Sequence, residues 1–196
     1  MSAAADPVLE NMRRRRVTRE FLAEPVSTED LRTILLAARL ASTAGARQIR
    51  RFLVIRDPDR INRLRPFAPG ILLGLPPALI VLSTDLEAAR EQNVQADRDT
   101  SVWVDVGTAL AHMMLAAEAL GLGSCPATSF SRSAVGEMLG FPDTLVPELL
   151  LQVGRPAAKP GGAKRGASGP PVADMTDWET LGQREPPEAA TSAAGV

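Results

Sequence analysis

The sequence predicts an α+β fold. Residues with helix-capping side chains precede segments in which apolar residues recur at helical spacing, and short continuous apolar runs typical of buried strands lie between these segments. The chain has 196 residues, of which 45% are apolar, and it contains no internal repeat. This length is sufficient for one sizeable core and short for two domains, so we expect one α+β domain.

The first predicted helix covers about residues 28–40. Ser27 and Asp30 resemble a capping box with a shortened acid, and the apolar residues that follow recur at helical spacing. A loop rich in small residues at 42–48 then leads to 52–55, a continuous apolar run bounded by arginines. We expect this run to be a buried strand.

A short helix and a second strand come next. Asp57 precedes Pro58, which suits the first position of a helix, and the helix is expected to end near Arg65. Residues 66–77 are rich in proline and glycine and are expected to form a loop. The apolar run at 78–83 is predicted to be a buried strand.

The longest predicted helix, at about 103–120, is apolar on nearly all sides. Gly121 and Gly123 are expected to end it, and the polar residues 85–101 before it are expected to form an exposed helix or a mobile lid. A helix with almost no polar face has to be buried all round. We therefore expect it at the centre of the domain or at a subunit interface.

Two short strands, at 124–125 and 149–154, and a helix that Ser131 caps and that ends near Gly140 complete the predicted domain. Residues 155–196 differ in composition, since 21 of these 42 residues are alanine, glycine or proline. Such a segment cannot bury enough apolar surface to offset the entropy of its own ordering. We divide the chain into a flexible N-terminus at 1–12, a domain at 13–155, a C-terminal arm at 156–184 in which Trp178 and Leu181 dock, and a disordered tail at 185–196.

Charge and composition exclude several classes of function. The formal net charge is −1, whereas a dedicated polyanion-binding protein has a strong basic excess. Cys125 and His112 are the single cysteine and the single histidine, too few for a structural zinc site. The apolar runs are shorter than the roughly 20 residues that span a bilayer, and the first residues lack the apolar stretch of a signal peptide. We expect no nucleic acid, metal or membrane partner, and a cytoplasmic location.

The residues that carry reactive chemistry are few. One histidine, one cysteine and no G-x-S-x-G motif leave no hydrolytic triad, and no phosphate-binding glycine loop is present. This pattern favours an enzyme whose bound cofactor performs the chemistry. Residues 1–65 carry a net charge of +6 and residues 66–196 carry −7. The arginines at 13–16 and Arg19 predict either an anion-binding cluster or a solvated basic surface.

Four motifs in order resemble the FMN-dependent nitroreductase superfamily. They are R-R-V-T-R-E-F at 15–21, S-T-A-G-A-R-Q at 42–48 followed by R-F-L-V-I, L-G-L-G-S-C-P-A-T-S-F at 120–130, and V-G-R-P at 153–156. The resemblance covers about residues 13–181. It implies a mixed sheet flanked by helices, an extended C-terminal arm and an intertwined homodimer with FMN at the subunit interface. Residues 60–70 and G-S-C-P-A-T-S-F also resemble the catalytic subunits of cyclodipeptide oxidases.

The resemblance assigns cofactor contacts residue by residue and assigns no catalytic side chain. The phosphate and the pyrimidine edge of the flavin are expected to meet Arg15, Arg16, Val17 and Arg19. A loop from the other subunit is expected to contribute Thr43, Ala44, Gly45 and Gln48. The turn against the flavin face corresponds to Pro126, Ala127, Thr128 and Ser129, and the basic residues that close on the phosphate correspond to Lys164 and Arg165.

The chain departs from the family pattern at four positions. Val17 replaces a serine and Ala46 replaces an asparagine, so a hydroxyl and an amide are missing. Ile49 and Arg50 replace a common Pro-Trp pair, which predicts a more basic wall over the ring. Outside these motifs, Trp103 and Phe130 are interpreted as stacking residues or core filler, His112 as a core or interface residue and Cys125 as a small buried hydrophobe.

The resemblance implies an FMN-dependent oxidoreductase. It would transfer hydride from NAD(P)H through flavin N5 to a small organic acceptor in two half-reactions with ping-pong kinetics. One alternative is a flavin-dependent dehydrogenase or oxidase of a small molecule such as a cyclic dipeptide, with oxygen as the acceptor. Another is a protein without turnover that binds flavin or acts as a scaffold, for instance with a small partner subunit.

Overall fold

The computed structural model describes residues 6–71, 74–95, 99–157 and 170–184. The chain divides into two compact units, residues 1–160 and residues 161–196. The first unit contains every strand among the described residues and all the helices from α1 to α6. It therefore carries the whole described core.

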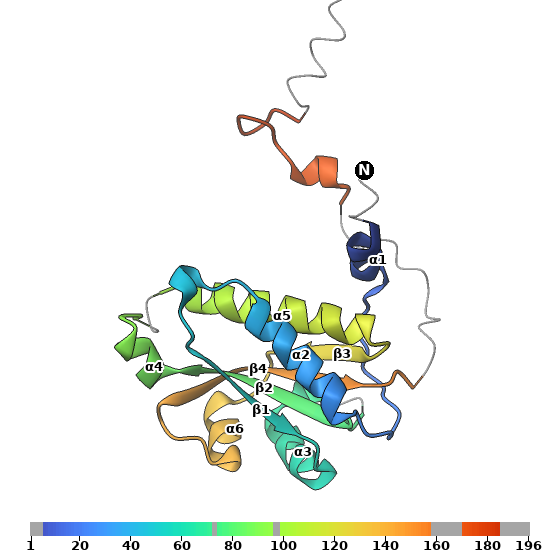
Figure 1. Ribbon diagram of the computed structural model, residues 1–196, viewed down its shortest axis with the longest axis vertical. Helices are drawn as coiled ribbons and strands as arrows, with labels where there is room; N and C mark the ends of the chain where they lie inside the picture. Colours follow the sequence, from blue (N-terminus) through green and yellow to red (C-terminus); the bar gives the residue numbers. More distant parts are fainter. Residues whose placement is uncertain (1–5, 72–73, 96–98, 158–169, 185–196) are drawn as a thin grey trace, which may run out of the picture. The chain divides into compact units, whose positions relative to one another are not determined.

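A four-stranded sheet forms the centre of the first unit (Figure 1). The strands lie in the order β1-β2-β4-β3, and each neighbouring pair is antiparallel. The α+β class is confirmed. The one parallel pairing among the described residues is an isolated bridge between Val17 and Ser124, so the expected mixed sheet is antiparallel in its named strands. The strands are β1 (Arg50–Ile55), β2 (Ala78–Asp85), β3 (Gly123–Ala127) and β4 (Leu145–Gly154).

Helices cover both faces of this sheet. Apolar residues of α2 and α5 form one core cluster with the strands, and apolar residues of α3 and α6 form another with the opposite sheet face. The helix α1 packs against α5, and the one-turn helices η2, η3 and η4 lie in the loops. The bounds are α1 (Asp6–Arg14), α2 (Thr28–Leu40), η2 (Ala44–Ala46), α3 (Pro58–Leu64), η3 (Arg65–Phe67), η4 (Pro69–Ile71), α4 (Leu86–Glu91), α5 (Ser101–Ala119) and α6 (Arg132–Leu139).

Strands β2 and β4 form the middle of the sheet because they are apolar on both faces. Ile80 and Leu82 of β2 face the cluster with α2 and α5, whereas Leu79 and Val81 face the cluster with α3 and α6. All four side chains are almost fully buried. A continuous apolar run, and not an alternating one, is the pattern that burial on both faces requires.

The expected elements are present, with longer strands. All four strands extend beyond their predicted ends. Among them, β3 continues through Pro126 and β4 begins before Pro147. Proline is tolerated there because β3 is an edge strand and β4 has no neighbour on one side before Leu150. The polar segment after β2 contains the helix α4, which agrees with the exposed-helix alternative.

Two helices differ in detail from the expectations. Residues 6–12 of the segment 1–12, predicted to be flexible, lie in α1, whose Asn11 Nδ2 donates to the carbonyl oxygen of Leu115 at 3.0 Å. Helix α5 has one exposed face in the single chain, where Val104 is 60% exposed and Trp103, Gly107 and Ala111 are also exposed, so of its two expected positions only the subunit interface would bury it all round. No helix in the described ranges is long and apolar enough to cross a membrane.

The described residues of the second unit form one short helical turn, η5 (Val172–Met175), followed by an irregular segment. Arg184 Nε lies 3.1 Å from Asp177 Oδ1, and the amide of Trp178 donates to the carbonyl oxygen of Gln183 at 2.7 Å. Leu181, expected to dock, is 95% exposed. The predicted tail at 185–196 lies outside the described residues.

Candidate functional site

The arginine-rich segment after α1 runs along the edge strand β3. Val17 bridges Ser124, and the amide of Thr18 donates to the carbonyl oxygen of Ser124 at 2.9 Å. A Cβ atom at Gly123 would overlap the Thr18 side chain, so this approach requires glycine. The segment from Arg15 to Arg19 is therefore held in place by backbone contacts and not by its charges.

The three arginines of this segment differ in the hydrogen bonds and ion pairs that their side chains form with the protein. Arg16 Nη1 donates to the carbonyl oxygens of Arg13 and Arg15, the latter at 3.0 Å. Arg15 is half-buried, and its enclosed Nη1 has no hydrogen-bond partner among the described residues. Arg19 is exposed and forms no ion pair within the described part of the chain. Arg15 and Arg19 therefore retain donors for an anionic group, since guanidinium is always charged.

Cys125 of β3 lies beside this segment. Burial raises the pKa of its thiol, and the positive charge of Arg19 opposes that rise. Cys125 is buried and not in a disulfide. A thiol in such surroundings stays protonated at neutral pH, as expected of a small buried hydrophobe.

The predicted flavin turn follows directly from β3. Pro126 and Ala127 end the strand, and Thr128 and Ser129 are exposed. Ser124, which holds the arginine segment, and Ala127 are three residues apart, or about 10 Å along a strand. Strand β3 thus brings the arginine segment and the predicted turn to the same edge of the sheet.

Sequence reasoning missed a third segment at this edge, in η4 and the residues after it. A Cβ atom at Gly70 would overlap the Ala127 side chain, and one at Gly74 would lie 3.4 Å from the carbonyl oxygen of Arg19. Gln152 is 2% exposed, and its Nε2 donates to the carbonyl oxygen of Gly70 at 2.9 Å. The available signal was the single amide within the apolar run of β4.

The predicted loop at 42–48 is held by the first turns of α5. Asp105, 4% exposed, accepts a hydrogen bond from the amide of Ala44 through Oδ1 at 3.0 Å. Thr108 Oγ1 donates to the carbonyl oxygen of Ser42 at 3.2 Å. The turn requires positive φ values of 64° at Gly45 and 56° at Ala46. Sequence reasoning missed Asp105, although a carboxylate in an apolar helix was a usable signal.

One protomer does not bring this loop to the arginine segment. The loop contacts α5 at Asp105, whereas α1 contacts α5 at Leu115. Ten helical residues separate these positions, which corresponds to about 15 Å. Figure 1 shows η2 near one end of α5 and α1 near the other. The predicted residues Lys164 and Arg165 lie outside the described residues.

The residues that depart from the family pattern and the aromatic residues lie in different parts of the structure. Ile49 is buried in a small cluster with Val94 and Val102, so it is core filler in this protomer. Trp103 lies under the guanidinium of Arg132, with 4.7 Å between Cζ and the ring centroid. Phe130 packs partly against the core cluster under α3 and α6, and His112 is exposed on α5.

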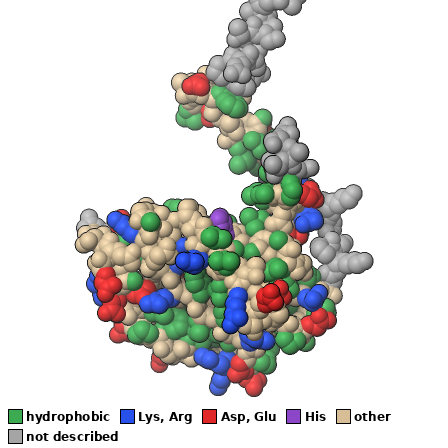
Figure 2. All heavy atoms as spheres, viewed as in Figure 1, with side chains coloured by type: hydrophobic (Ala, Val, Ile, Leu, Met, Phe, Trp, Pro, Cys, Tyr) green, Lys and Arg blue, Asp and Glu red, His purple; other side chains and the backbone are tan. Residues whose placement is uncertain are grey.

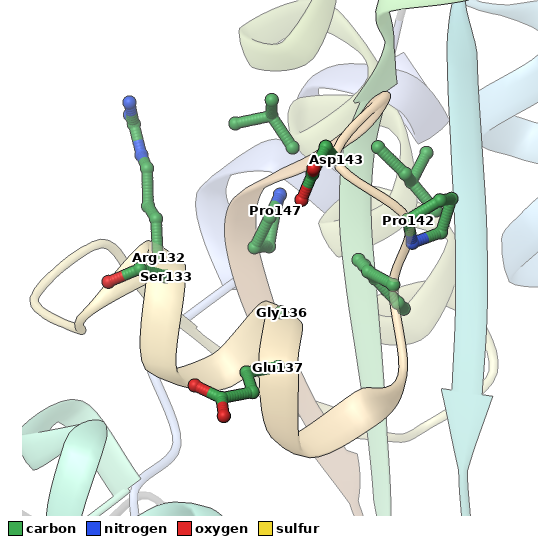
Figure 3. Close-up of a pocket in the computed structure, with 10 residues that line it drawn as sticks. Arg132, Ser133, Gly136, Glu137, Pro142, Asp143 and Pro147 are labelled. Atoms are coloured by element: carbon green, nitrogen blue, oxygen red, sulfur yellow. The ribbon is translucent and has the colours of Figure 1, made fainter.

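Arg132 connects α6 to the sheet through a buried carboxylate. Its Nη2 lies 3.1 Å from Glu148 Oε2, and Glu148 Oε1 accepts a hydrogen bond from Thr84 Oγ1 at 3.0 Å. Figure 3 shows the Arg132 side chain extending away from a cavity of about 440 Å³ that lies between α6 and the loop before β4. None of the predicted cofactor residues lines this cavity.

The fold and the site together define an α+β protein with an arginine-rich segment along one edge of its sheet and a small-residue loop held by the first turns of its long helix. The profile of the nitroreductase family, described as "Nitroreductase family", matches residues 12–74 and 69–155. The chain belongs to the nitroreductase family.

Two relatives and one solved structure illustrate the similarity. An NADH dehydrogenase of Thermus thermophilus is 31% identical over 172 residues, covering 74% of this chain and 84% of that protein. An FMN reductase (NADPH) of Bacillus subtilis is 26% identical, covering 76% and 66%. A nitroreductase family protein from Clostridium difficile has a TM-score of 0.75 at 28% identity, covering 88% of this chain and 98% of that one.

Proposed function

We propose that this chain is an FMN-dependent oxidoreductase of the nitroreductase type that uses NAD(P)H as electron donor and a small organic molecule as acceptor. The observation that carries the proposal is the enclosed Nη1 of Arg15, which has no hydrogen-bond partner among the described residues, on the same segment as the exposed Arg19, which is held against β3. Two guanidinium groups with free donors suit a phosphate dianion. The FMN and NAD(P)H assignments follow the relatives named for these molecules.

The residues present fit FMN. Arg15 would hold the phosphate, and Arg19 would lie by the pyrimidine edge of the flavin. Thr128 and Ser129, exposed after β3, would offer backbone donors to the ring. Val17 and Ala46 offer no side-chain hydrogen bond where the family has serine and asparagine, so the arginines carry a larger share of cofactor binding here.

FMN, when bound, would supply the two-electron chemistry that links NAD(P)H oxidation to reduction of the acceptor. The chain itself would bind and orient the cofactor and adjust its reduction potential. A guanidinium at Arg19 would stabilise negative charge at the pyrimidine edge of the ring, which favours reduction. We assign no side chain as a proton donor or nucleophile.

We further propose that the active form is a homodimer. Within one chain the loop at 43–48 contacts α5 at Asp105, whereas α1, which leads into the arginine segment, contacts α5 at Leu115, about 15 Å further along the helix. We infer that one cofactor takes the loop and the arginine segment from two protomers. Helix α5 also exposes an apolar face through Val104, Gly107 and Ala111, a surface typical of an interface. The C-terminal arm would pack on the partner subunit.

The purified full-length chain tests this function directly. We expect a yellow protein that releases FMN on denaturation, identified by mass, and that loses its 450 nm flavin absorbance under anaerobic NADPH without any added protein. A colourless protein that takes up no added FMN would instead support a scaffold without turnover. A protein that binds FMN, is not bleached by NADPH or NADH, but is bleached by a cyclic dipeptide would support the oxidase alternative.

A further inference from the structure

A second basic groove lies between the end of α2 and β1. Its volume is about 590 Å³, which is within the usual range for sites that hold small molecules. It is lined by Leu35, Arg39, Leu40, Gln48, Arg50 and Phe52. Figure 2 shows basic side chains over α2 with hydrophobic side chains between them.

The charges of this groove have one sign. Arg39 has no ion pair or hydrogen bond among the described residues. Arg50 Nη1 donates to the backbone carbonyl oxygen of Asp105 at 3.2 Å, while its Nε is enclosed without a partner in the described part of the chain. Burial lowers the pKa of Arg50 and the charge of Asp105 opposes this, but an arginine stays charged at neutral pH. None of the lining residues is acidic.

The rest of the lining suits the body of an organic ligand. Leu35, Leu40 and Phe52 supply apolar surface, and Phe52 packs against the core cluster beneath α2. The backbone of Gln48 is held by the Gln92 side chain, which accepts from its amide at 3.0 Å and donates to its carbonyl at 3.3 Å. The Gln48 position is therefore fixed without using its own side-chain amide.

Within one protomer this groove is separate from the arginine segment of the cofactor site. Arg50 and Phe52 belong to β1, whereas the segment from Arg15 to Arg19 lies along β3, and β1 and β3 are opposite edges of the sheet. Three strand spacings separate these edges, which corresponds to about 14 Å. Within one chain the groove and the arginine segment are therefore separate, while Gln48 in the groove is also the last residue of the loop proposed to meet the cofactor of the partner subunit.

We propose that the groove between α2 and β1 binds an organic anion with an apolar body. The anionic group lies between Arg39 and Arg50, and the apolar body lies on Leu35, Leu40 and Phe52. A carboxylate and a phosphate share the chemistry that two guanidinium groups recognise. The proposal concerns binding and stands whether or not the protein turns over NAD(P)H.

Calorimetric titration with a matched pair of ligands tests the charge requirement. The probes are 2-naphthoate, which is anionic, and 2-naphthamide, its neutral analogue, added to the full-length chain in the presence of FMN. We expect naphthoate to bind roughly tenfold or more tightly than naphthamide, and its affinity to fall with added salt, since hydrogen bonds to charged groups are the strong ones and salt screens them. Equal affinity for the two probes would overturn the proposal.

Substitutions of arginines on α2 and β1 test whether naphthoate binds in this groove. Arg39→Gln, on the surface, is expected to weaken naphthoate binding roughly tenfold and to leave naphthamide binding unchanged. Arg32→Gln, which removes an exposed charge from the same helix away from the groove, should have no effect. Arg50→Lys retains the charge and should retain part of the affinity. Naphthoate binding that is unaffected by Arg39→Gln shows that the anion lies elsewhere.

Competition with naphthoate distinguishes a phosphate ligand from a carboxylate ligand. Displacement of naphthoate by oxidised NADP⁺ would assign the groove to a nucleotide phosphate, and displacement by benzoate but not by NADP⁺ would assign it to a carboxylate. Both results support an anion site. If naphthoate binds the FMN-free chain and added FMN displaces it, the groove belongs to the cofactor cleft and the proposal of a separate site is wrong.

Discussion

Single polar side chains in apolar surroundings lie at the parts of this molecule for which a function is proposed. Asp105 holds the loop at 42–48, and Gln152 holds Gly70 next to the predicted turn. The Nη1 atom of Arg15 is enclosed and has no hydrogen-bond partner among the described residues. Burying a polar group without a hydrogen bond is costly, so each of these groups needs a partner from the protein or from a ligand. For Arg15, the proposed partner is a phosphate.

Replacing Arg15 with alanine is expected to weaken FMN binding by about 1.5–3 kcal/mol, the scale of a hydrogen bond to a charged group. Fluorescence titration of the FMN-free chain measures the dissociation constant. The matched control is Arg13→Ala, because the Arg13 side chain is exposed and its one ion pair among the described residues is with Glu10, at 4.0 Å. An Arg15 variant that retains parental affinity contradicts the assigned role.

Replacing Arg19 with glutamine is expected to lower the reduction potential of the bound flavin. Loss of a charge-assisted contact worth about 1–3 kcal/mol corresponds to roughly 20–60 mV for a two-electron couple. An anaerobic redox titration against a reference dye measures it. Glu20→Gln removes an adjacent exposed charge of opposite sign and should not lower the potential. Equal potentials in the parent and in Arg19→Gln would show that Arg19 does not face the ring.

At the level of elements, helix caps join the helices to the sheet. Ser27, Asp57, Asp85 and Ser131 each accept a backbone amide at the start of a helix. Asp85 ends β2 and caps α4, and its Oδ2 also lies 2.9 Å from Arg51 Nε. The backbone amide of Ala88, and then the Arg51 side chain, lower the pKa of Asp85 below its ordinary value.

The Asp85 carboxylate therefore contributes stability that depends on pH. Because its pKa is lower in the folded chain than in the unfolded chain, the contribution is present above the ordinary value of 3.8 and is lost as the pH falls through the folded value. We expect the free energy of unfolding of Asp85→Asn to fall less than that of the parent between about pH 4 and 2. Urea denaturation across this range measures it, with Asp59→Asn as an exposed control. Parallel pH profiles for parent and variant would contradict the prediction.

Local sequence patterns predicted which helices and strands are present better than they predicted where each one begins and ends. The caps at Ser27, Asp57 and Ser131 correctly marked the starts of three helices, because a cap is a contact between near neighbours in the chain. The N-terminal helix α1 was missed because it is short and mostly polar, and its contact with α5 depends on Asn11 reaching Leu115. Such contacts between distant residues leave little trace in local sequence.

The same limit applies to the candidate site. The motif spacing predicted that the arginine segment and the turn after β3 belong together, and the structure brings them to one edge. The contributions of Gly70, Gly74 and Asp105 were not predicted, because each depends on which loop packs beside which strand or helix. The role of every cofactor residue stays a prediction until FMN binding is measured.

The whole molecule presents the two parts of the predicted cofactor site at the two ends of α5. The apolar face of α5 between them includes Val104, which is 60% exposed in the single chain. Val104 shares a helix face with Gly107 and Ala111, which are also exposed, and we expect this apolar surface to lie in a subunit interface. We therefore predict that dimer formation completes the cofactor site as well as burying the apolar face of α5.

Replacing Val104 with glutamate is expected to shift the protein from dimer to monomer, because it places an unpaired charge in an apolar interface. Sedimentation velocity measures the change, and FMN affinity should fall with it. Met138→Glu makes the same change at an exposed position of α6 and should leave the dimer intact. A Val104 variant that sediments like the parent places the interface elsewhere.

The distance between Asp105 and Leu115 along α5 has a consequence for any measurement of cofactor content. If each cofactor needs both ends of the helix, and therefore two chains, flavin retention obeys mass action in protein as well as in FMN. At a fixed concentration of free FMN, dilution of the protein would then release flavin, and the loss would be reversed by concentrating the protein at the same free FMN. A chain that held its cofactor through one end only would show no such dependence.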